Sequence, residues 1–171
     1  LYWFKVLAQP PVLLEDGVPT TTGEMKEVVF TDPIARDVVI ALLSSNLFSL
    51  YYTMWSSCQV VNSQDFDFPG DLEHLIASDG LELSRLTHAL MDDYQNNSTI
   101  QERHYSSRGR RYVMHKQYFF LKKSKHIIDS IDRVLKRHYA LTDEELDFII
   151  SYDIKYRLGD ELFEEDDDLE D

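Results

Sequence analysis

The chain has 171 residues, of which 43% are hydrophobic, and its formal net charge is −14. A chain of this length buries roughly 70% of its unfolded surface on folding, so it needs no disulfide or metal ion to hold a core together. Its one cysteine, Cys58, excludes an intramolecular disulfide and fits a reducing cytoplasm. The opening Leu1–Phe4 contains neither an initiator Met nor a basic signal-peptide region, so we expect a segment of a longer protein.

The charge is unevenly distributed. Eleven of the seventeen Lys and Arg residues lie between Arg103 and Arg137, where Asp129 and Asp132 are the only acids. Nine acids crowd into residues 160–171, and their repulsion, with few apolar residues between them, predicts a disordered tail. Net acidity argues against a nucleic-acid partner, but the basic segment reverses that argument locally.

Short apolar runs separated by turn residues predict β-strands in the opening thirty residues. The runs are 2–7, 12–14 and 27–30, with turns at Pro10–Pro11 and Asp16–Gly17. Asp32 followed by Pro33 predicts a helix start, because the Asp side chain can cap and the proline φ suits the first turn. We expect one helix from Pro33 to about Trp55 at the centre of the core.

Residues 38–55 carry no charged side chain, so a membrane span has to be considered. Serine, asparagine and threonine interrupt the run, and no Lys or Arg follows nearby to orient it. The sequence therefore favours a buried helix of a globular protein.

The second half combines strand-like and helical patterns. Alternation over 59–69 predicts a strand, a helix then begins near Asp71 and breaks at Gly80 before resuming, and 100–109 is expected to be a polar, mobile connection. Residues 112–121 predict a strand or extended segment, and an amphipathic helix begins at Ser124. Thr142 and Glu145 form a capping box for a last helix ending near residue 158.

These elements predict an α+β fold, with a small mixed or antiparallel sheet packed with a central buried helix. A C-terminal helical hairpin and the disordered acidic tail follow. The expected domains are 1–121, an α+β unit, 122–159, the helical pair, and 160–171, the tail.

Patterns that mark catalytic or metal sites are missing from the sequence. The six glycines are scattered, the six histidines are never closely paired, and one cysteine is present. Asp153-Ile154-Lys155 only loosely approximates a nuclease motif, and we treat it as chance. We therefore predict no catalytic residue, no cofactor site and no metal site in this segment.

A basic segment interleaved with aromatic residues is the candidate binding site. Arginine pairs with phosphate or guanine, lysine supplies a point charge, and Gly109 lets the backbone approach closely. The plainer alternative is an exposed basic loop beside a core-facing aromatic strand, but the cluster as a whole favours nucleic acid. The predicted DNA contacts here are Arg103, Arg108, Arg110, Arg111, Lys116, Lys122, Lys123 and Lys125.

Two stretches resemble known proteins. Residues 39–55, with a short link to Asn62-Ser-Gln-Asp-Phe66, resemble the helix and following strand in target-recognition domains of adenine-specific DNA methyltransferases and type I restriction specificity subunits. Residues 123–159 are similar to the C-terminal ending of large bacterial restriction-modification proteins that carry an adenine methylase, some fused to an endonuclease. Together the stretches cover less than half of the chain.

The resemblance implies a parent protein that transfers a methyl group from S-adenosylmethionine to adenine, flipping the base into an Asn/Asp-Pro-Pro-Tyr/Phe pocket. Gln9-Pro-Pro-Val12 lacks both the first residue and the aromatic of that motif. What is implied here is a non-catalytic target-recognition fragment of a type II restriction-modification enzyme in the cytoplasm. Its implied partners are double-stranded DNA and an upstream methyltransferase domain of the same chain, with no membrane, and Asn62 and Gln64 join the candidate DNA contacts.

A protein–protein docking module of a restriction-modification complex is the alternative. The apolar face of the 124–138 helix separates the two hypotheses. If that face is exposed, docking gains support; if the helix packs on the 142–151 helix, the pair is a C-terminal cap. An independent nuclease has the weakest support.

Overall fold

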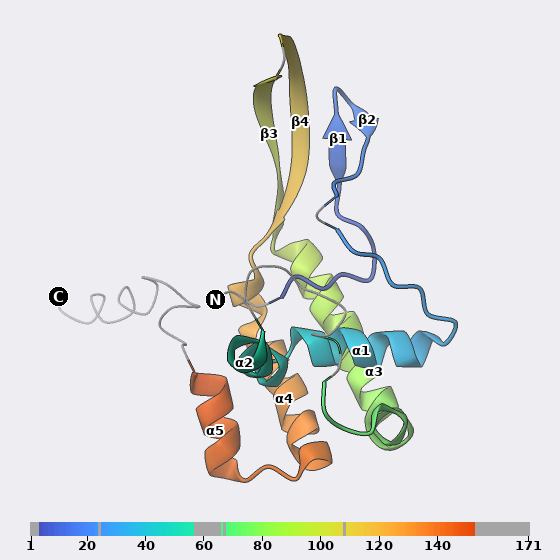
Figure 1. Ribbon diagram of the computed structural model, residues 1–171, viewed down its shortest axis with the longest axis vertical. Helices are drawn as coiled ribbons and strands as arrows, with labels where there is room; N and C mark the ends of the chain where they lie inside the picture. The colour runs from blue at the N-terminus through green and yellow to red at the C-terminus, as the bar shows by residue number, and fades with distance from the viewer. Residues whose placement is uncertain (1–3, 24, 57–65, 67, 108, 153–171) are drawn as a thin grey trace, which may run out of the picture.

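The computed structural model describes residues 4–23, 25–56, 66, 68–107 and 109–152. A body of helices carries a sheet that projects from one end (Figure 1). The helices are α1 (Pro33–Ser44), α2 (Asn46–Trp55), α3 (Leu72–Asn96), the short 3-10 helix η2 (Leu121–Ser124), α4 (Lys125–Tyr139) and α5 (Asp143–Ser151). The strands are β1 (Leu13–Glu15), β2 (Val18–Pro19), β3 (Ser98–Ser107) and β4 (Arg110–Phe119). The sheet has the order β2-β1-β4-β3 and is antiparallel throughout, so the predicted α+β class is confirmed.

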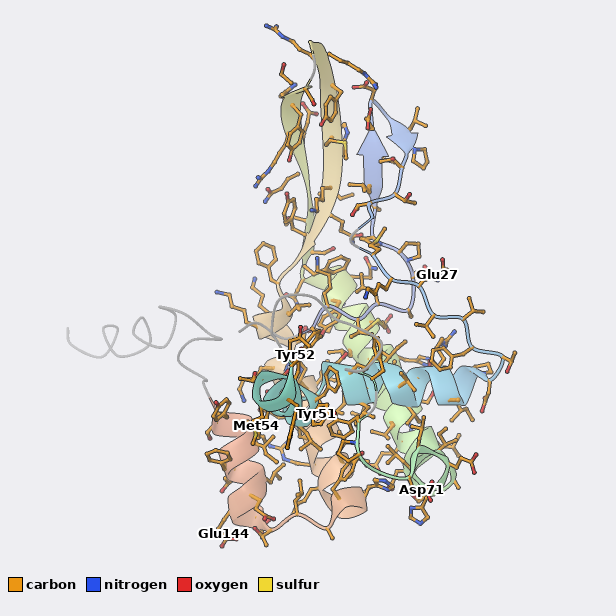
Figure 2. The ribbon with its side chains drawn as sticks, viewed as in Figure 1. Glu27, Tyr51, Tyr52, Met54, Asp71 and Glu144 are labelled. Atoms are coloured by element: carbon orange, nitrogen blue, oxygen red, sulfur yellow. The ribbon has the colours of Figure 1, made fainter. Side chains whose placement is uncertain are left out.

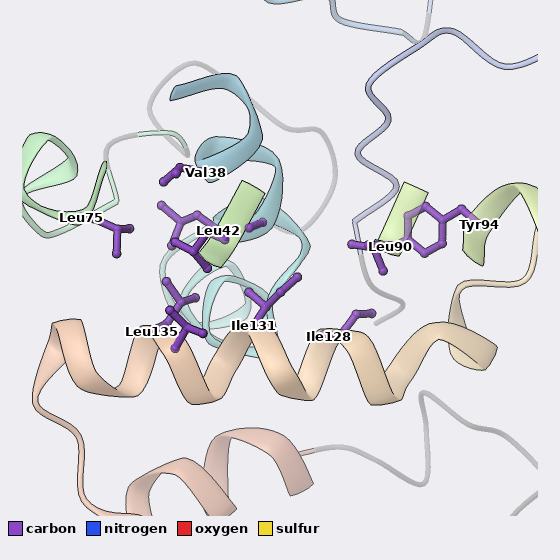
Figure 3. Close-up of a cluster of buried hydrophobic side chains, with 11 residues drawn as sticks. Val38, Leu42, Leu75, Leu90, Tyr94, Ile128, Ile131 and Leu135 are labelled. Carbon is purple, nitrogen blue, oxygen red and sulfur yellow. The ribbon is translucent and has the colours of Figure 1, made fainter. Parts of the chain in front are cut away.

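The hydrophobic core lies between α1, α3 and α4. Figure 3 shows α4 presenting its apolar side to the other helices, while α5 runs along its opposite side. Burial of this face follows from its apolar residues recurring every three to four positions. The buried cluster consists of Val38, Ala41, Leu42, Leu75, Leu83, Leu90, Tyr94, Ile128, Ile131, Val134 and Leu135.

The single helix expected over 33–55 is wrong, because the chain bends by 64° between α1 and α2. Ser45 lies at the bend, where its Oγ donates to the Leu42 carbonyl (2.6 Å) and accepts from the Phe48 N–H (2.9 Å). A carboxylate from α4 completes the bend, since Asp132 accepts from the backbone N–H groups of Asn46 (3.1 Å) and Leu47 (3.0 Å). Helix N-termini favour such anionic acceptors.

Within the described ranges, no single helix is long and apolar enough to cross a membrane. Only α1 and α2 together meet the length and composition, and they do so across the 64° bend.

The helix break expected at Gly80 is also wrong, because α3 continues through it without interruption. Gly80 is buried against α1, and a Cβ there would lie 3.0 Å from Cγ2 of Ile34. The missing side chain therefore lets two helices approach closely, a use of glycine that outweighs its low helix propensity.

Several expected strands take other conformations. The described residues of the run 2–7 and all of 27–30 lie outside the sheet, whereas the Asp16–Gly17 turn is confirmed, with φ of 50° and 82°. Most of the strand expected over 59–69 lies outside the described residues. Phe68, which is described, instead packs edge-on against the rings of Tyr51 (4.8 Å) and Tyr139 (5.6 Å).

The mobile connection expected over 100–109 is wrong, because most of it is β3, which pairs with β4 along its whole length. We call this β3–β4 hairpin the arm. Its register runs from Ser98 opposite Phe119 to Ser107 opposite Arg110, and Gly109 in the turn has a φ of +79° that favours glycine.

Gln117 anchors the root of the arm. Its buried side chain accepts from the Val12 N–H (3.0 Å) and donates to Gln95 Oε1 (2.8 Å) and Ser98 Oγ (2.9 Å). One amide thus joins the segment before β1, the end of α3 and the start of β3, and it fixes where the arm leaves the body.

Candidate nucleic-acid interface

The arm has two chemically different faces. Directly opposite residues of an antiparallel pair share one face, and successive residues alternate between faces. The observed register therefore defines a tyrosine face, which contains Arg103, Tyr105, Arg110, Tyr112, Met114, Lys116 and Tyr118. The opposite, histidine face contains Glu102, His104, Arg111, Val113 and His115.

Aromatic rings and cations alternate on the tyrosine face. The rings of Tyr105 and Tyr112 are nearly parallel, 16° apart in orientation, with centroids separated by 5.6 Å. Near the root, the Tyr118 ring lies beneath two cations, the Arg103 guanidinium at 5.3 Å and the Lys116 ammonium at 5.7 Å. The ring faces attract the cations and hold them without neutralising their charge.

A hollow of about 290 Å³ lies on the tyrosine face. The arm forms its floor, and residues of the β1–β2 segment border it, namely Leu13, Glu15 and 20–22. Both aromatic and basic side chains line it, so it can receive a flat ring beside an anion.

The histidine face carries a network around one carboxylate. Glu102 lies 3.2 Å from His104 Nε2 through one oxygen and 3.2 Å from His115 Nε2 through the other. Arg111 is exposed nearer the tip, where it borders a second hollow of about 440 Å³ together with Asp16 and Val113. This face is less basic than the tyrosine face because the carboxylate of Glu102 offsets its one arginine, Arg111.

Arg110, a predicted DNA contact, joins the arm to the β1–β2 turn. Its Nη2 lies 3.0 Å from Glu15 Oε1 and 2.9 Å from Asp16 Oδ2. The pKa of Asp16 is lowered, first by the hydrogen bond from the Val113 N–H and then by Arg110. In this structure Arg110 therefore holds the neighbouring hairpin to the arm, and a phosphate has to compete with two carboxylates for it.

Three of the predicted lysine contacts, Lys122, Lys123 and Lys125, lie at the root of the arm. Lys122 and Lys123 belong to η2, where the Lys123 ammonium lies 5.6 Å from the centroid of the Phe120 ring. Lys125 begins α4 and is mostly buried, with its ammonium 2.5 Å from Asp129 Oδ2. The root therefore offers Lys123 to a ligand more openly than Lys125.

The remaining predicted contacts, Arg108, Asn62 and Gln64, lie outside the described residues. Among the contacts on the arm that are described, the fold brings Arg103, Arg110 and Lys116 onto one face and places Arg111 on the other. Figure 2 shows side chains extending from both sides of the arm along its length.

Lys5 is a cation that the sequence analysis missed. Its ammonium lies 5.7 Å from the centroid of the Phe119 ring at the end of β4. Burial lowers its pKa, and the charge of Lys116 lowers it further. Only the tertiary fold brings this residue to the root of the arm, because more than a hundred residues separate it from β4.

The structure also bears on metal binding and on docking through the apolar face of α4. The part of the chain that the structure describes contains no group of three or more His, Cys, Asp or Glu side chains placed to hold a metal ion. The apolar face of α4 is buried in the core, and α5 packs beside that helix, so this face is not open for docking.

Comparisons with protein families, with curated proteins and with solved structures found no match for this chain.

Proposed function

We propose that this chain binds double-stranded DNA through the arm and the lysines at its root. One observation carries the proposal: the arm projects from an acidic chain, yet residues 98–125 contain eight Lys and Arg residues and a single acid, Glu102. Cations gathered on a projecting element can neutralise phosphates and release counterions, which drives binding to DNA.

The dimensions of the arm suit a duplex. Ten paired residues span about 33 Å at roughly 3.3 Å per residue. This is close to one turn of B-DNA, and a two-stranded ribbon fits a major groove about 12 Å wide. An arm of this length can therefore meet phosphates on both sides of a groove.

The wider context of the proposal rests on the resemblance of residues 39–66 and 123–159. It makes the chain a non-catalytic target-recognition segment of a bacterial adenine-specific restriction-modification methyltransferase in the cytoplasm. S-adenosylmethionine then belongs to the parent protein, and the upstream methyltransferase domain is the second partner. The arm supplies phosphate contacts and sequence choice in this arrangement.

Salt dependence of duplex binding tests the proposal. We would compare the chain with a triple arm variant, Arg103→Gln, Arg111→Gln and Lys116→Gln, by fluorescence anisotropy over a range of salt concentrations. Loss of three phosphate contacts should reduce the slope of log affinity against log salt by about 2.7, at about 0.9 per contact.

A body variant with the same charge change, Arg133→Gln, Lys136→Gln and Arg137→Gln, is the matched control. Its slope should equal that of the unmodified chain, because these residues lie on α4 away from the arm. Equal loss in both variants, or no duplex binding by the unmodified chain, would show that the arm is not a DNA-binding element.

A further inference from the structure

We infer that the hollow on the tyrosine face binds one unpaired nucleotide of otherwise duplex DNA. This inference rests on the proposed DNA binding of the arm and names the part of the ligand that the tyrosine face receives. Phosphate binding alone explains the cations of the arm. It does not explain why they are interleaved with tyrosines around a bounded hollow.

The tyrosines provide surfaces on which a base can stack. Tyr105 and Tyr112 lie side by side with nearly parallel rings, and Tyr105 remains 42% exposed at a distance from the core. Every nucleobase has a flat π-face, so stacking on an aromatic side chain needs no particular sequence. A base within a duplex already stacks on its neighbours, and only an unpaired base can offer its face to a side chain.

Arg103 and Lys116 lie where the phosphate of such a nucleotide needs them. Both cations contact the Tyr118 ring and border the same hollow as Tyr105 and Tyr112. A stacked base and its own phosphate are only a sugar apart, so neighbouring aromatic and basic groups can hold one nucleotide at two points. Protein sites that bind unpaired nucleic acid combine these two kinds of group.

The size and charge of the hollow suit a single nucleotide. Its volume is about 290 Å³, at the lower limit for small-molecule sites, and the β1–β2 segment borders it on one side. Glu15 is the one carboxylate among its described lining residues, against the two cations Arg103 and Lys116. A phosphate therefore meets a net positive lining.

Binding to three labelled DNA probes tests the inference: a fully paired duplex, the same duplex with one unpaired thymidine, and its single strand. The unmodified chain should bind the bulged duplex about five- to 150-fold more tightly than the paired duplex, the range that stacking of one base supplies. Replacing the unpaired residue by 2-aminopurine should show quenched fluorescence on binding, because the base stacks on a ring.

Three variants localise the effect. Tyr105→Leu with Tyr112→Leu should abolish the preference for the bulge, while Tyr105→Phe with Tyr112→Phe should keep it because the rings remain. Phe148→Leu, which changes an exposed aromatic side chain of α5, should leave it unchanged. Circular dichroism on each variant checks that the fold is intact.

The outcomes separate this inference from the proposed function. Equal, salt-dependent binding of paired and bulged duplexes would leave DNA binding standing and overturn the inference. A bulge preference that survives the double leucine variant would overturn it as well. Failure to bind any probe would overturn both.

Discussion

The body and the arm differ in what their basic side chains contact. In the body, Arg137 pairs with Asp79 at 2.9 Å and with Glu82 at 2.5 Å, and Arg36 pairs with Asp37 at 2.6 Å. On the arm, Arg103 and Lys116 lie over an aromatic ring, which leaves their charge available. A net charge of −14 is therefore compatible with a basic surface, because body cations such as Arg36 and Arg137 are paired with acids, whereas Arg103 and Lys116 on the arm remain available to an external anion.

The two regions also differ in how they use buried polar groups. Asp37 of α1 accepts hydrogen bonds from Ser84 Oγ (2.7 Å) and lies 3.0 Å from His88 Nε2, which ties α1 to α3. Asp132 similarly ties α4 to α2. Apart from its root at Gln117, the described arm is mostly exposed, so its chemistry can change with little effect on the stability of the body.

The largest expected difference between the regions is in core packing. Leu83→Ala should lower the free energy of unfolding by about 2–5 kcal/mol, because Leu83 is fully buried and its loss leaves a cavity. Ile100→Ala on the arm should change it by at most about 0.5 kcal/mol, since Ile100 is 57% exposed. Urea unfolding of both variants measures this contrast, and equal losses would mean that the arm is part of the core.

A pH effect of about 3 kcal/mol is expected from Asp132. Burial raises its pKa from 3.8 to about 6, against the opposing effect of its hydrogen bonds from Leu47 and Asn46. Between pH 3.8 and about pH 6 the Asp132 side chain is protonated more in the folded chain than in the unfolded chain. This group therefore makes the free energy of unfolding fall as pH rises through that interval.

Asp132→Asn removes that titration. The stability of the unmodified chain relative to this variant should therefore decrease by roughly 2 kcal/mol from pH 4 to pH 7, because at about 1.4 kcal/mol per pKa unit the rest of the effect falls below pH 4. Subtracting the variant cancels contributions from other carboxyl groups, including Asp16 and Asp79, whose lowered pKa acts in the opposite direction. Parallel pH profiles for the two proteins would contradict the assignment.

Gln117→Ala tests the junction between the regions. It leaves the Val12 N–H without its side-chain acceptor and should cost about 1–3 kcal/mol. The loss should be concentrated in the arm, where amide hydrogen exchange should accelerate more than in α3 and α4. Uniform acceleration in both regions would show that arm and body unfold as one unit.

The smallest expected effect on stability comes from Lys123→Gln. Because Lys123 contacts the Phe120 ring at the surface, its replacement should change the free energy of unfolding by at most about 0.5 kcal/mol. It should nevertheless lower the salt slope of duplex binding by about 0.9. Lys136→Gln, at the far end of α4, is the control and should leave the slope unchanged.

Elements defined by neighbouring residues could be predicted from the sequence. Asp32 caps α1 by accepting from the Ile34 N–H at 3.0 Å, and Thr142 with Glu145 forms the predicted capping box of α5. The strand expected near 112–121 and the helix expected from Ser124 correspond to β4 and α4. The caps depend on contacts within a few residues, and the strand and helix are indicated by the types and spacing of side chains along each segment.

The errors arose where distant residues decide the structure. Asp132 lies more than eighty residues from the bend at Ser45 that it stabilises, and Gly80 continues its helix because Ile34 packs against it. Residues 98–107 form a strand because β4 supplies the partner. The sequence alone predicts the basic cluster. It does not give the register of β3 and β4, which is what places Arg103 and Tyr118 on the same face.

If the length of this arm varies, an even or odd number of residues added to each strand decides which face the side chains beyond the insertion occupy. Two residues added to each strand near the turn extend it by about 7 Å and keep both faces as they are, because side chains alternate with a period of two. One residue added to each strand instead moves every residue between the insertion and the turn to the opposite face. Gln117 anchors the arm at its root, far from the turn. Even-numbered insertions near the turn can therefore change the length of the arm without altering its anchor or the helical body.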